Sequence, residues 1–197
     1  EYAVNQAAKK DIKESDYKAA FESYTPEVTA QIIKLDSEDK AKEVLEADKA
    51  EGADFAQIAK DNSTDTATKD KGGEVKFDSG TADIPSQVKE AAFKLDENGI
   101  SDVITVSAGQ NYSASYYIVK LNKKTEKGSD WKKYEKRLKE IIVDGRKQDT
   151  NYIRSIIAKA MTNANIKVKD DAFKSTFNQY LQNIGVQTSD SSSSSKK

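Results

Sequence analysis

Between residues 28 and 121, apolar residues recur first with the spacing of a strand and then with the spacing of a helix, several times in turn. The order of these segments constrains the fold more than any other feature of this chain. Alternating apolar residues are typical of a strand, and apolar residues three or four apart are typical of a helix. The order here is strand, helix, helix, strand, helix, strand, strand, which favours an α+β domain with an antiparallel sheet. The expected strands cover residues 28–35, 75–77, 102–106 and 116–121.

The helices between these strands have recognisable starts. Asp36 or Ser37 is expected to cap the first, Asp54 opens the second, and the third begins at Ser86. The first helix has an inward repeat, and Gly52 suits a left-handed stop after it. The residues at that repeat are Ala41, Val44, Leu45 and Asp48. Residues 62–73 are polar, rich in threonine and end in two glycines, a composition that indicates a mobile loop.

Helical periods also precede this central stretch. Residues 1–10 predict the end of a helix whose beginning lies before Glu1. A second short helix follows, with Ser15 as its expected cap. Pro26 then marks a boundary, because the residue before a proline disfavours helical geometry.

A second helical region follows the central stretch. One long helix is expected from Ser129 to Ala164, with Gly145 as a candidate bend. A further helix is expected after Asp170. The last residues, 188–197, form a serine-rich segment whose composition is typical of disorder.

The composition excludes several classes of site. The chain contains no cysteine and no histidine, which excludes disulfides, the common zinc ligand sets and serine–histidine catalysis. Its 32 basic and 33 acidic residues give no one-signed field that would attract nucleic acid. We therefore expect no metal, no cofactor and no nucleic-acid partner. No apolar run reaches about eighteen residues, so we expect neither a membrane span nor an export signal within the chain.

Short motifs in the central stretch resemble the parvulin family of peptidyl-prolyl cis/trans isomerases. They are Asp65, Gly72-Gly73, Phe77, Ile84-Pro85, Ala91-Ala92-Phe93-Lys94-Leu95 and Ser115-Tyr116-Tyr117-Ile118-Val119-Lys120-Leu121. The two histidines of that family fall on Gln31, within Ala30-Gln31-Ile32-Ile33, and on Tyr117. The resemblance therefore implies a parvulin-like scaffold whose polar centre is rewritten.

The resemblance places Asp65, Gln31 and Tyr117 in the family's polar cluster. Only Asp65 matches, since that position holds Cys or Asp in the family. Gln31 and Tyr117 can preserve hydrogen bonds between the two central strands, but an amide and a phenol do not titrate near neutrality as two imidazoles do. Two alternatives stay open: Asp65 makes a local turn in its Ser-Thr-Asp-Thr segment, and Gln31 and Tyr117 are structural.

The resemblance also implies an apolar pocket for the proline ring. Rotation about an Xaa-Pro bond crosses a barrier of about 20 kcal/mol without covalent change, so a catalyst needs such a pocket and polar groups that favour the twisted amide. The implied pocket wall consists of Val75, Phe77, Ile84 and Val88. The same four residues would serve equally well as ordinary core. Residues 107–112 lengthen the hairpin before the last strand, and they either cover the pocket or form a neutral extension.

Matches outside the centre extend the resemblance over nearly the whole chain. Residues 24–28 and 165–170 resemble segments of the PrsA-type foldase lipoproteins found outside the Gram-positive membrane. In that family the N- and C-terminal segments combine into one helical chaperone lobe, and the isomerase domain is inserted between them. The implied organisation is a helical segment at 1–26, a parvulin-like domain at 27–124, a second helical segment at 125–187, and a disordered tail at 188–197.

The resemblance implies a foldase or chaperone for secreted proteins after translocation, with an isomerase activity that is weak or lost because both family histidines are replaced. One alternative is a working Xaa-Pro isomerase that uses Asp65 and the apolar pocket, and another is a surface adhesion or structural module. The expected partners are unfolded or partly folded secreted proteins, and a homodimer through the helical segments is a further prediction. The implied location is the outer face of the Gram-positive cell membrane, with the lipid anchor outside this chain.

Overall fold

Two compact units make up the chain. The computed structural model describes residues 2–107, 114–163, 179 and 182–183. The sheet unit is Ser23–Asp130, and the helical unit combines Glu1–Glu22 with Trp131–Lys197. In the sequence, the sheet unit is therefore inserted between the two parts of the helical unit.

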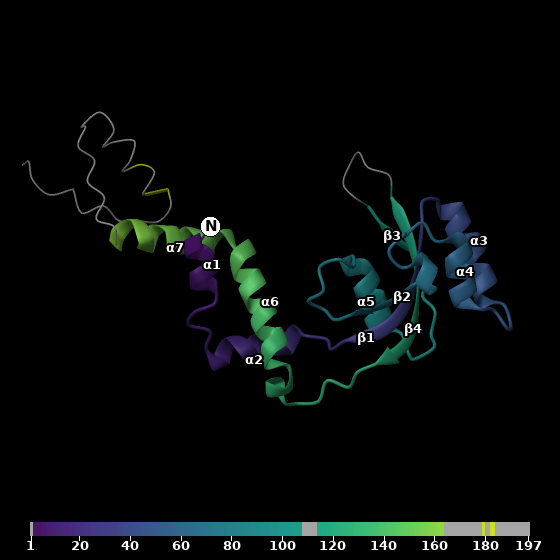
Figure 1. Cartoon of the computed structure of the whole chain (residues 1–197), viewed down its shortest axis with the longest axis horizontal. Coiled ribbons are helices and arrows are strands. Elements are labelled where there is room, and N and C mark those ends of the chain that lie inside the picture. Colours follow the sequence, from purple (N-terminus) through teal and green to yellow (C-terminus); the bar gives the residue numbers. More distant parts are fainter. Residues whose placement is uncertain (1, 108–113, 164–178, 180–181, 184–197) are drawn as a thin grey trace, which may run out of the picture. The chain divides into compact units, whose positions relative to one another are not determined.

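Four antiparallel strands form the sheet of the sheet unit. They are β1 (Val28–Leu35), β2 (Glu74–Phe77), β3 (Ile104–Val106) and β4 (Ser115–Lys124). Their order is β2-β1-β4-β3, so the two longest strands lie at the centre (Figure 1). β1 and β4 pair from Val28 with Lys124 to Leu35 with Tyr116, with an irregularity between Thr29 and Ala30. The predicted α+β class with an antiparallel sheet is confirmed.

In the described part of the sheet unit, three α-helices accompany the sheet: α3 (Glu38–Lys49), α4 (Phe55–Asn62) and α5 (Ser86–Lys94). The Ser37 side chain accepts a hydrogen bond from the backbone N–H of Lys40, so Ser37, rather than Asp36, caps α3. Asp54 caps α4 in the same way. Gly52 lies in the left-handed region with φ 78°, as expected for the stop between the two helices.

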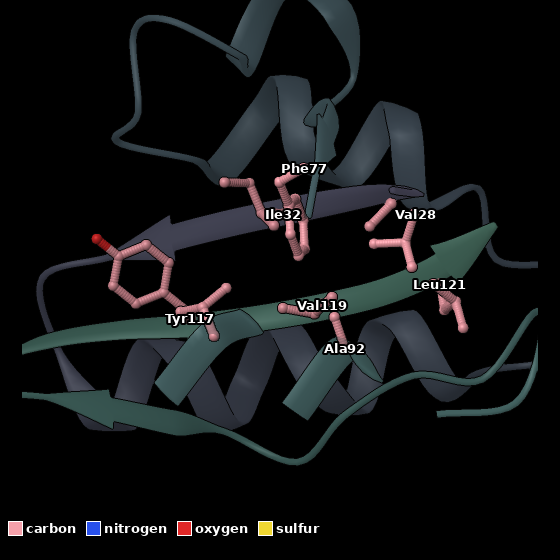
Figure 2. Packing of buried hydrophobic residues seen from close by; sticks show 9 residues of the cluster. Val28, Ile32, Phe77, Ala92, Tyr117, Val119 and Leu121 are labelled. Carbon is pink, nitrogen blue, oxygen red and sulfur yellow. The ribbon is translucent and has the colours of Figure 1, made fainter. Parts of the chain in front are cut away.

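A hydrophobic core lies on each face of the sheet, because successive strand residues point to opposite faces. Figure 1 shows α5 on one side of the sheet and α3 and α4 on the other. The first core, on the α5 side, contains Val28, Ala30, Ile32, Phe77, Val88, Ala92, Tyr117, Val119 and Leu121 (Figure 2). The second core contains Ile33, Leu35, Ala41, Val44, Leu45, Phe55, Ala59 and Ile118. Each fully buried large apolar side chain contributes roughly 1.5–3 kcal/mol, so the sheet is held from both faces.

The glycine-ended segment 62–73 is wound into turns rather than left as an open loop. A short 3-10 helix, η1, covers Lys69–Lys71, and the backbone N–H of Gly73 donates to the carbonyl oxygen of Thr68. Gly73 has φ 78°, and a Cβ at this position would lie 2.4 Å from the carbonyl oxygen of Ile32. Only glycine allows this approach, which lets the backbone N–H of Ile32 donate to the carbonyl oxygen of Gly73 at 2.9 Å.

The helical unit contains α1 (Tyr2–Ala8), α2 (Glu14–Ser23), the 3-10 helix η2 (Trp131–Tyr134), α6 (Glu135–Gln148) and α7 (Thr150–Asn163). Aromatic stacking joins its two sequence parts, because Tyr17 stacks on Trp131 at 5.0 Å and Phe21 on Tyr134 at 6.0 Å between ring centroids. The prediction that Ser15 caps α2 is wrong. α2 already begins at Glu14, and the backbone N–H of Lys13 donates to the Asp16 carboxylate to close the first turn.

The single long helix predicted from Ser129 to Ala164 is also wrong. This stretch begins with the 3-10 helix η2 at Trp131, and the α-helix that follows, α6, ends at Gln148. The break is not at Gly145, because Asp149 accepts hydrogen bonds at Oδ1 from the backbone N–H groups of Asn151 and Tyr152 and so caps a new helix.

Arg146 connects four elements of the helical unit. Its Nη1 donates to the carbonyl oxygens of Ala8, at 3.2 Å, and Lys10, at 2.9 Å. Its Nη2 forms an ion pair with Asp16 at 3.0 Å, and the guanidinium lies 5.5 Å from the centroid of the Tyr152 ring. Because Arg146 lies on α6 and donates to carbonyls at and just after the C-terminal end of α1, one side chain ties the N-terminal segment to α6.

Several predicted features lie outside the described residues: the hairpin extension after Ser107, the helix after Asp170, and the tail at 188–197. Among the helices that are described, none combines the length and the apolar character that crossing a membrane requires.

Candidate active site

Asp65 lies in a tight local turn of the sheet unit. Its Oδ1 accepts a hydrogen bond from the backbone N–H of Ala67 at 3.2 Å, and its Oδ2 accepts one from the hydroxyl of Thr68 at 2.6 Å. Its own N–H donates to Oγ of Ser63 at 3.3 Å. This geometry is the local side-chain turn that the sequence offered as the alternative to a functional Asp65. The turn also fixes the carboxylate in one place, so the two roles are compatible.

The side chain of Gln31 does not contact that of Tyr117. The Nε2 group of Gln31 donates to the carbonyl oxygen of Gly72 at 2.9 Å. In the register of the sheet, Gln31 pairs with Lys120, whereas Tyr117 pairs with Lys34. Paired residues share a face and neighbours alternate, so Gln31 and Tyr117 point to opposite faces of the sheet. The predicted hydrogen bonding of Gln31 with Tyr117 across the central strands is therefore wrong.

Tyr117 lies at the edge of the first core. Its side chain is 8% exposed, and its hydroxyl group is on the side of the ring away from Val119 (Figure 2). Burial raises the pKa of the Tyr117 phenol above its ordinary value of 10.0, and the negative charges of Asp65 and Asp36 raise it further. The phenol therefore stays protonated near neutral pH and can donate a hydrogen bond. The structure thus brings Tyr117 and Asp65 into electrostatic range, and leaves Gln31 out of this pair.

Two of the four pocket-wall residues belong to the first core, and the other two pack against it. Phe77 is 1% exposed and Val88 is 0% exposed, and the Phe77 ring packs against Phe93 at 5.8 Å between centroids. Val75 and Ile84 are partly buried and pack against the same core. Phe77 and Val88 thus serve as core in this structure, while Val75 and Ile84 keep part of their surface exposed.

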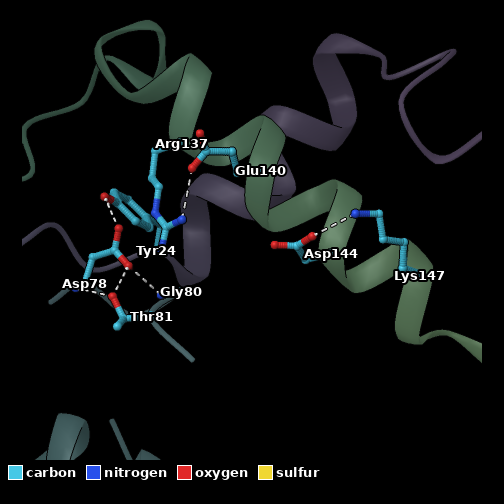
Figure 3. Close-up of polar contacts among 8 residues, drawn as sticks. All are labelled: Tyr24, Asp78, Gly80, Thr81, Arg137, Glu140, Asp144 and Lys147. Atoms are coloured by element: carbon cyan, nitrogen blue, oxygen red, sulfur yellow. Dashed lines mark hydrogen bonds and ion pairs between the residues drawn. The ribbon is translucent and has the colours of Figure 1, made fainter. Parts of the chain in front are cut away.

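A polar network next to the pocket wall was missed by the sequence analysis. Asp78, which follows Phe77, is 7% exposed, and its Oδ2 accepts a hydrogen bond from the Tyr24 hydroxyl at 3.1 Å (Figure 3). Its Oδ1 accepts from the backbone N–H of Gly80 at 2.9 Å and from the hydroxyl of Thr81 at 3.1 Å. The Asp-Ser-Gly-Thr sequence signals a turn at this place, but nothing local indicates the partner Tyr24.

Asp48 is the second buried carboxylate in the sheet unit. It is 5% exposed on the inner side of α3, and neither carboxylate oxygen has a hydrogen-bond partner among the described residues. Burial raises the pKa of Asp48 from 3.8 to about 7, and the charge of Lys120 opposes part of this shift. Asp48 faces the second core, away from Tyr117, so it affects the stability of α3 rather than the candidate site.

The described residues contain no group of three or more acidic side chains that could hold a metal ion. The candidate residues on the first-core side are the partly buried Val75 and Ile84 and the protonated phenol of Tyr117, with the carboxylate of Asp65 in electrostatic range of that phenol. Such a set can bind an apolar ring and donate a hydrogen bond, but it offers no nucleophile poised beside a base.

Comparison with known proteins identifies the family. The family model described as "Rotamase: PPIC-type PPIASE domain" matches residues 23–123, just over half of the chain. The chain is 64% identical over 185 residues to the "Foldase protein PrsA" of Streptococcus sanguinis, which covers 94% of this chain and 55% of that protein. The chain belongs to the PrsA foldases. Its sheet unit carries the rotamase domain of this family.

Solved PrsA structures agree with this assignment. The crystal structure of foldase protein PrsA from Streptococcus pneumoniae matches with a TM-score of 0.83 at 55% identity, over 91% of this chain and 65% of that one. The PrsA structure from Lactococcus lactis matches with a TM-score of 0.71 at 35% identity, over 91% of this chain and 64% of that one. The chain spans 55% to 62% of the length of the PrsA foldases from S. sanguinis and S. pneumoniae.

Proposed function

We propose that this chain helps secreted proteins to fold outside the cell membrane, and that its rotamase domain binds proline-containing segments but isomerises them weakly or not at all. The observation that carries this proposal is the rewritten polar cluster on a preserved family scaffold. The fold matches PrsA foldases, while the resemblance to the parvulin family places Gln31 and Tyr117 at the positions of that family's two histidines.

The geometry supports a weak catalyst. Gln31 is engaged with Gly72 on the opposite face of the sheet from Tyr117, so the two substituted side chains do not rebuild a joint site. Asp65 already accepts hydrogen bonds from Ala67 and Thr68, which reduces its capacity to bind a substrate group. Rotation of a prolyl bond needs no proton transfer, so the loss of two imidazoles lowers the rate without excluding the reaction.

Residual isomerisation has one specific observation in its favour. The Tyr117 phenol is neutral, nearly buried and beside the first core, where Val75 and Ile84 present apolar surface. A donor at the edge of an apolar surface is the arrangement that would bind a twisted Xaa-Pro amide better than a planar one. We keep a slow, histidine-free isomerase as the second candidate function.

The helical unit, Glu1–Glu22 with Trp131–Lys197, is the proposed chaperone lobe, for which the sequence predicted residues 1–26 and 125–187. In α7, Ile153, Ile156 and Ile157 are all half-buried, and in α1 Tyr2 is 78% exposed. Partly exposed apolar side chains among charged ones suit weak binding of many extended clients without an energy source. Unfolded or partly folded secreted proteins are therefore the proposed partners.

A homodimer through the helical unit and a lipid anchor outside this chain remain parts of the proposal. Light scattering over a concentration series tests the first, because a mass fixed at the 21.8 kDa of one chain would contradict it. Attachment to the outer face of the membrane is tested by fractionating cells that produce the full-length protein.

The decisive experiment measures cis/trans exchange of Xaa-Pro peptides by NMR, with and without the protein. The informative variants are Tyr117→Phe and Asp65→Asn, with Tyr116→Phe and Asp70→Asn as matched controls. Tyr116 packs on the second core, and Asp70 is exposed in the same turn segment as Asp65.

Acceleration that falls only in the first pair of variants establishes the slow isomerase. No acceleration, together with suppressed aggregation of several unrelated unfolded proteins, leaves the chaperone function alone. Failure of both measurements would contradict the proposed function.

A further inference from the structure

The loop between β2 and α5 is tied down along its backbone. Asp78 begins it and accepts hydrogen bonds from Gly80 and Thr81. The hydroxyl of Thr81 in turn accepts from the backbone N–H of Asp78 at 3.1 Å, and the N–H of Thr81 donates to the carbonyl oxygen of Asp78 at 3.2 Å. These bonds close a turn directly after Phe77, the buried aromatic residue of the pocket wall.

The segment that enters the sheet unit holds the same loop. The Tyr24 hydroxyl donates to Asp78, and both side chains are buried, at 5% and 7% exposure (Figure 3). The next residue pairs with the loop twice: the N–H of Thr25 donates to Oγ of Ser79 at 2.9 Å, and the N–H of Ser79 donates to the carbonyl oxygen of Thr25 at 3.1 Å. Tyr24 comes two residues after Glu22, where the first part of the helical unit ends.

α5 holds the loop from its other end. The Nζ of Lys89 donates to the carbonyl oxygens of Ser79, at 3.0 Å, and Thr81, at 2.6 Å. Lys89 adjoins Val88, and Ile84 lies between Thr81 and the start of α5. Three of the four pocket-wall residues, Phe77, Ile84 and Val88, are therefore adjacent to this network or within its loop.

We propose that Asp78 is a positioning residue for the proline-binding surface, and that Tyr24 makes the position of that surface depend on the segment joining the two units. The inference rests on the proposed binding of proline-containing segments. Asp78 contacts none of the reacting atoms. It acts through the loop that places Ile84 against the first core.

The physical reason is the burial of the Tyr24–Asp78 bond. Hydrogen bonds to a charged acceptor are stronger than neutral ones, and a buried carboxylate that loses a donor is left incompletely satisfied. The loop then gains freedom at the point where Ile84 must face a proline ring. Binding that depends on a fixed surface weakens when the surface has to be ordered first.

The test compares the full chain with Tyr24→Phe, Asp78→Asn and the double variant, and uses Tyr116→Phe as the control. Tyr24→Phe removes one hydroxyl and keeps the ring, and Tyr116→Phe makes the same change on the opposite face of the sheet. Two quantities are measured by NMR: the methyl signals of Ile84 and Ile33, and the Kd of a proline-containing peptide.

We expect Tyr24→Phe to shift and broaden the Ile84 methyl signal, to leave the Ile33 signal of the second core unchanged, and to raise the peptide Kd roughly three- to tenfold. Asp78→Asn should have a larger effect, because it removes the charge that accepts from Gly80 and Thr81 as well as from Tyr24, and the double variant should fall short of the sum of the single effects, because both changes weaken the same bond. Tyr116→Phe should change neither quantity.

An Ile84 signal and a Kd that Tyr24→Phe leaves unchanged would overturn the inference, and so would strictly additive effects in the double variant. If the wild-type chain binds no proline peptide, the proposed binding function fails. The Ile84 methyl response then still decides whether Tyr24 and Asp78 position the loop.

Discussion

Replacement of Asp48 by asparagine should stabilise the sheet unit at neutral pH and remove most of its pH dependence between pH 4 and 7. Asp48 is 5% exposed at the last turn of α3, and both its oxygens lack a hydrogen-bond partner in the described part of the chain. Its pKa is raised from 3.8 to about 7, with burial as the main cause. The folded state therefore holds this proton to a higher pH than the unfolded state does.

The sign and size of the effect follow from linkage. Below pH 3.8 the carboxyl is protonated in both states and costs nothing extra. As the pH rises from about 4 to 7, the unfolded state ionises first, so stability falls by about 1.4 kcal/mol per pH unit and then levels off. The full penalty is about 4 kcal/mol, and relaxation around the charge reduces it, so we expect Asp48→Asn to gain ~2–4 kcal/mol at pH 8 and nearly nothing at pH 4.

The assay must report on the sheet unit alone. The single tryptophan, Trp131, lies in the helical unit, so its fluorescence follows that unit instead. Urea unfolding is therefore followed by the methyl NMR signals of Ile33 and Ile118, which belong to the second core beside Asp48. A carbon NMR titration of the Asp48 carboxyl measures the pKa directly.

Glu46→Gln is the matched control, because it removes the same charge from an exposed position of α3. It should change the stability of the sheet unit by less than about 0.5 kcal/mol at either pH. An Asp48 carboxyl that titrates near 4, or a pH dependence that persists in Asp48→Asn, would refute the reasoning.

Three further substitutions test the fold. Gly73→Ala should destabilise the sheet unit by about 2–4 kcal/mol, because the new Cβ would collide with the carbonyl oxygen of Ile32. Gly52→Ala, at the same φ but with open space around it, should cost only about 1 kcal/mol, and thermal unfolding of the two variants measures the difference. Arg146→Lys should lower the urea midpoint of the helical unit, measured by Trp131 fluorescence, while Arg154→Lys on the exposed side of α7 should not. Asp149→Ala should cost about 1 kcal/mol and speed amide exchange at Asn151 and Tyr152, effects that Asp149→Asn should largely avoid.

The sequence predicted those parts of the sheet unit that depend on local patterns. Ser37 and Asp54 cap α3 and α4 as expected, since a capping side chain acts within three residues of its own position. The strand at residues 28–35 was likewise recognisable, because its apolar residues, several of them β-branched, fill the cores on both faces of the sheet. In the helical unit the capping residue Asp149 was not recognised, and the bend was expected at Gly145 instead.

The long-range contacts could not be predicted from the sequence. The hydrogen bond between Tyr24 and Asp78 joins residues 54 positions apart, and no local period records it. The register of β1 and β4 shifts at an irregularity between Thr29 and Ala30. The register after this shift determines that Gln31 and Tyr117 face opposite sides of the sheet. A shift of one residue reverses every side chain of a strand, so a family position alone does not establish a contact.

The pH dependence of any isomerase activity distinguishes this centre from one built on two imidazoles. The chain has no histidine, and burial together with the charges of Asp65 and Asp36 holds the pKa of Tyr117 above 10.0. The phenol thus keeps its proton between pH 5 and 8, so the rate of Xaa-Pro exchange should be constant over this range. The measurement is made in Asp48→Asn, where the buried carboxylate of α3 no longer titrates. A bell-shaped profile or a step near pH 6 to 7 would mean that a titrating group other than Tyr117 limits the reaction.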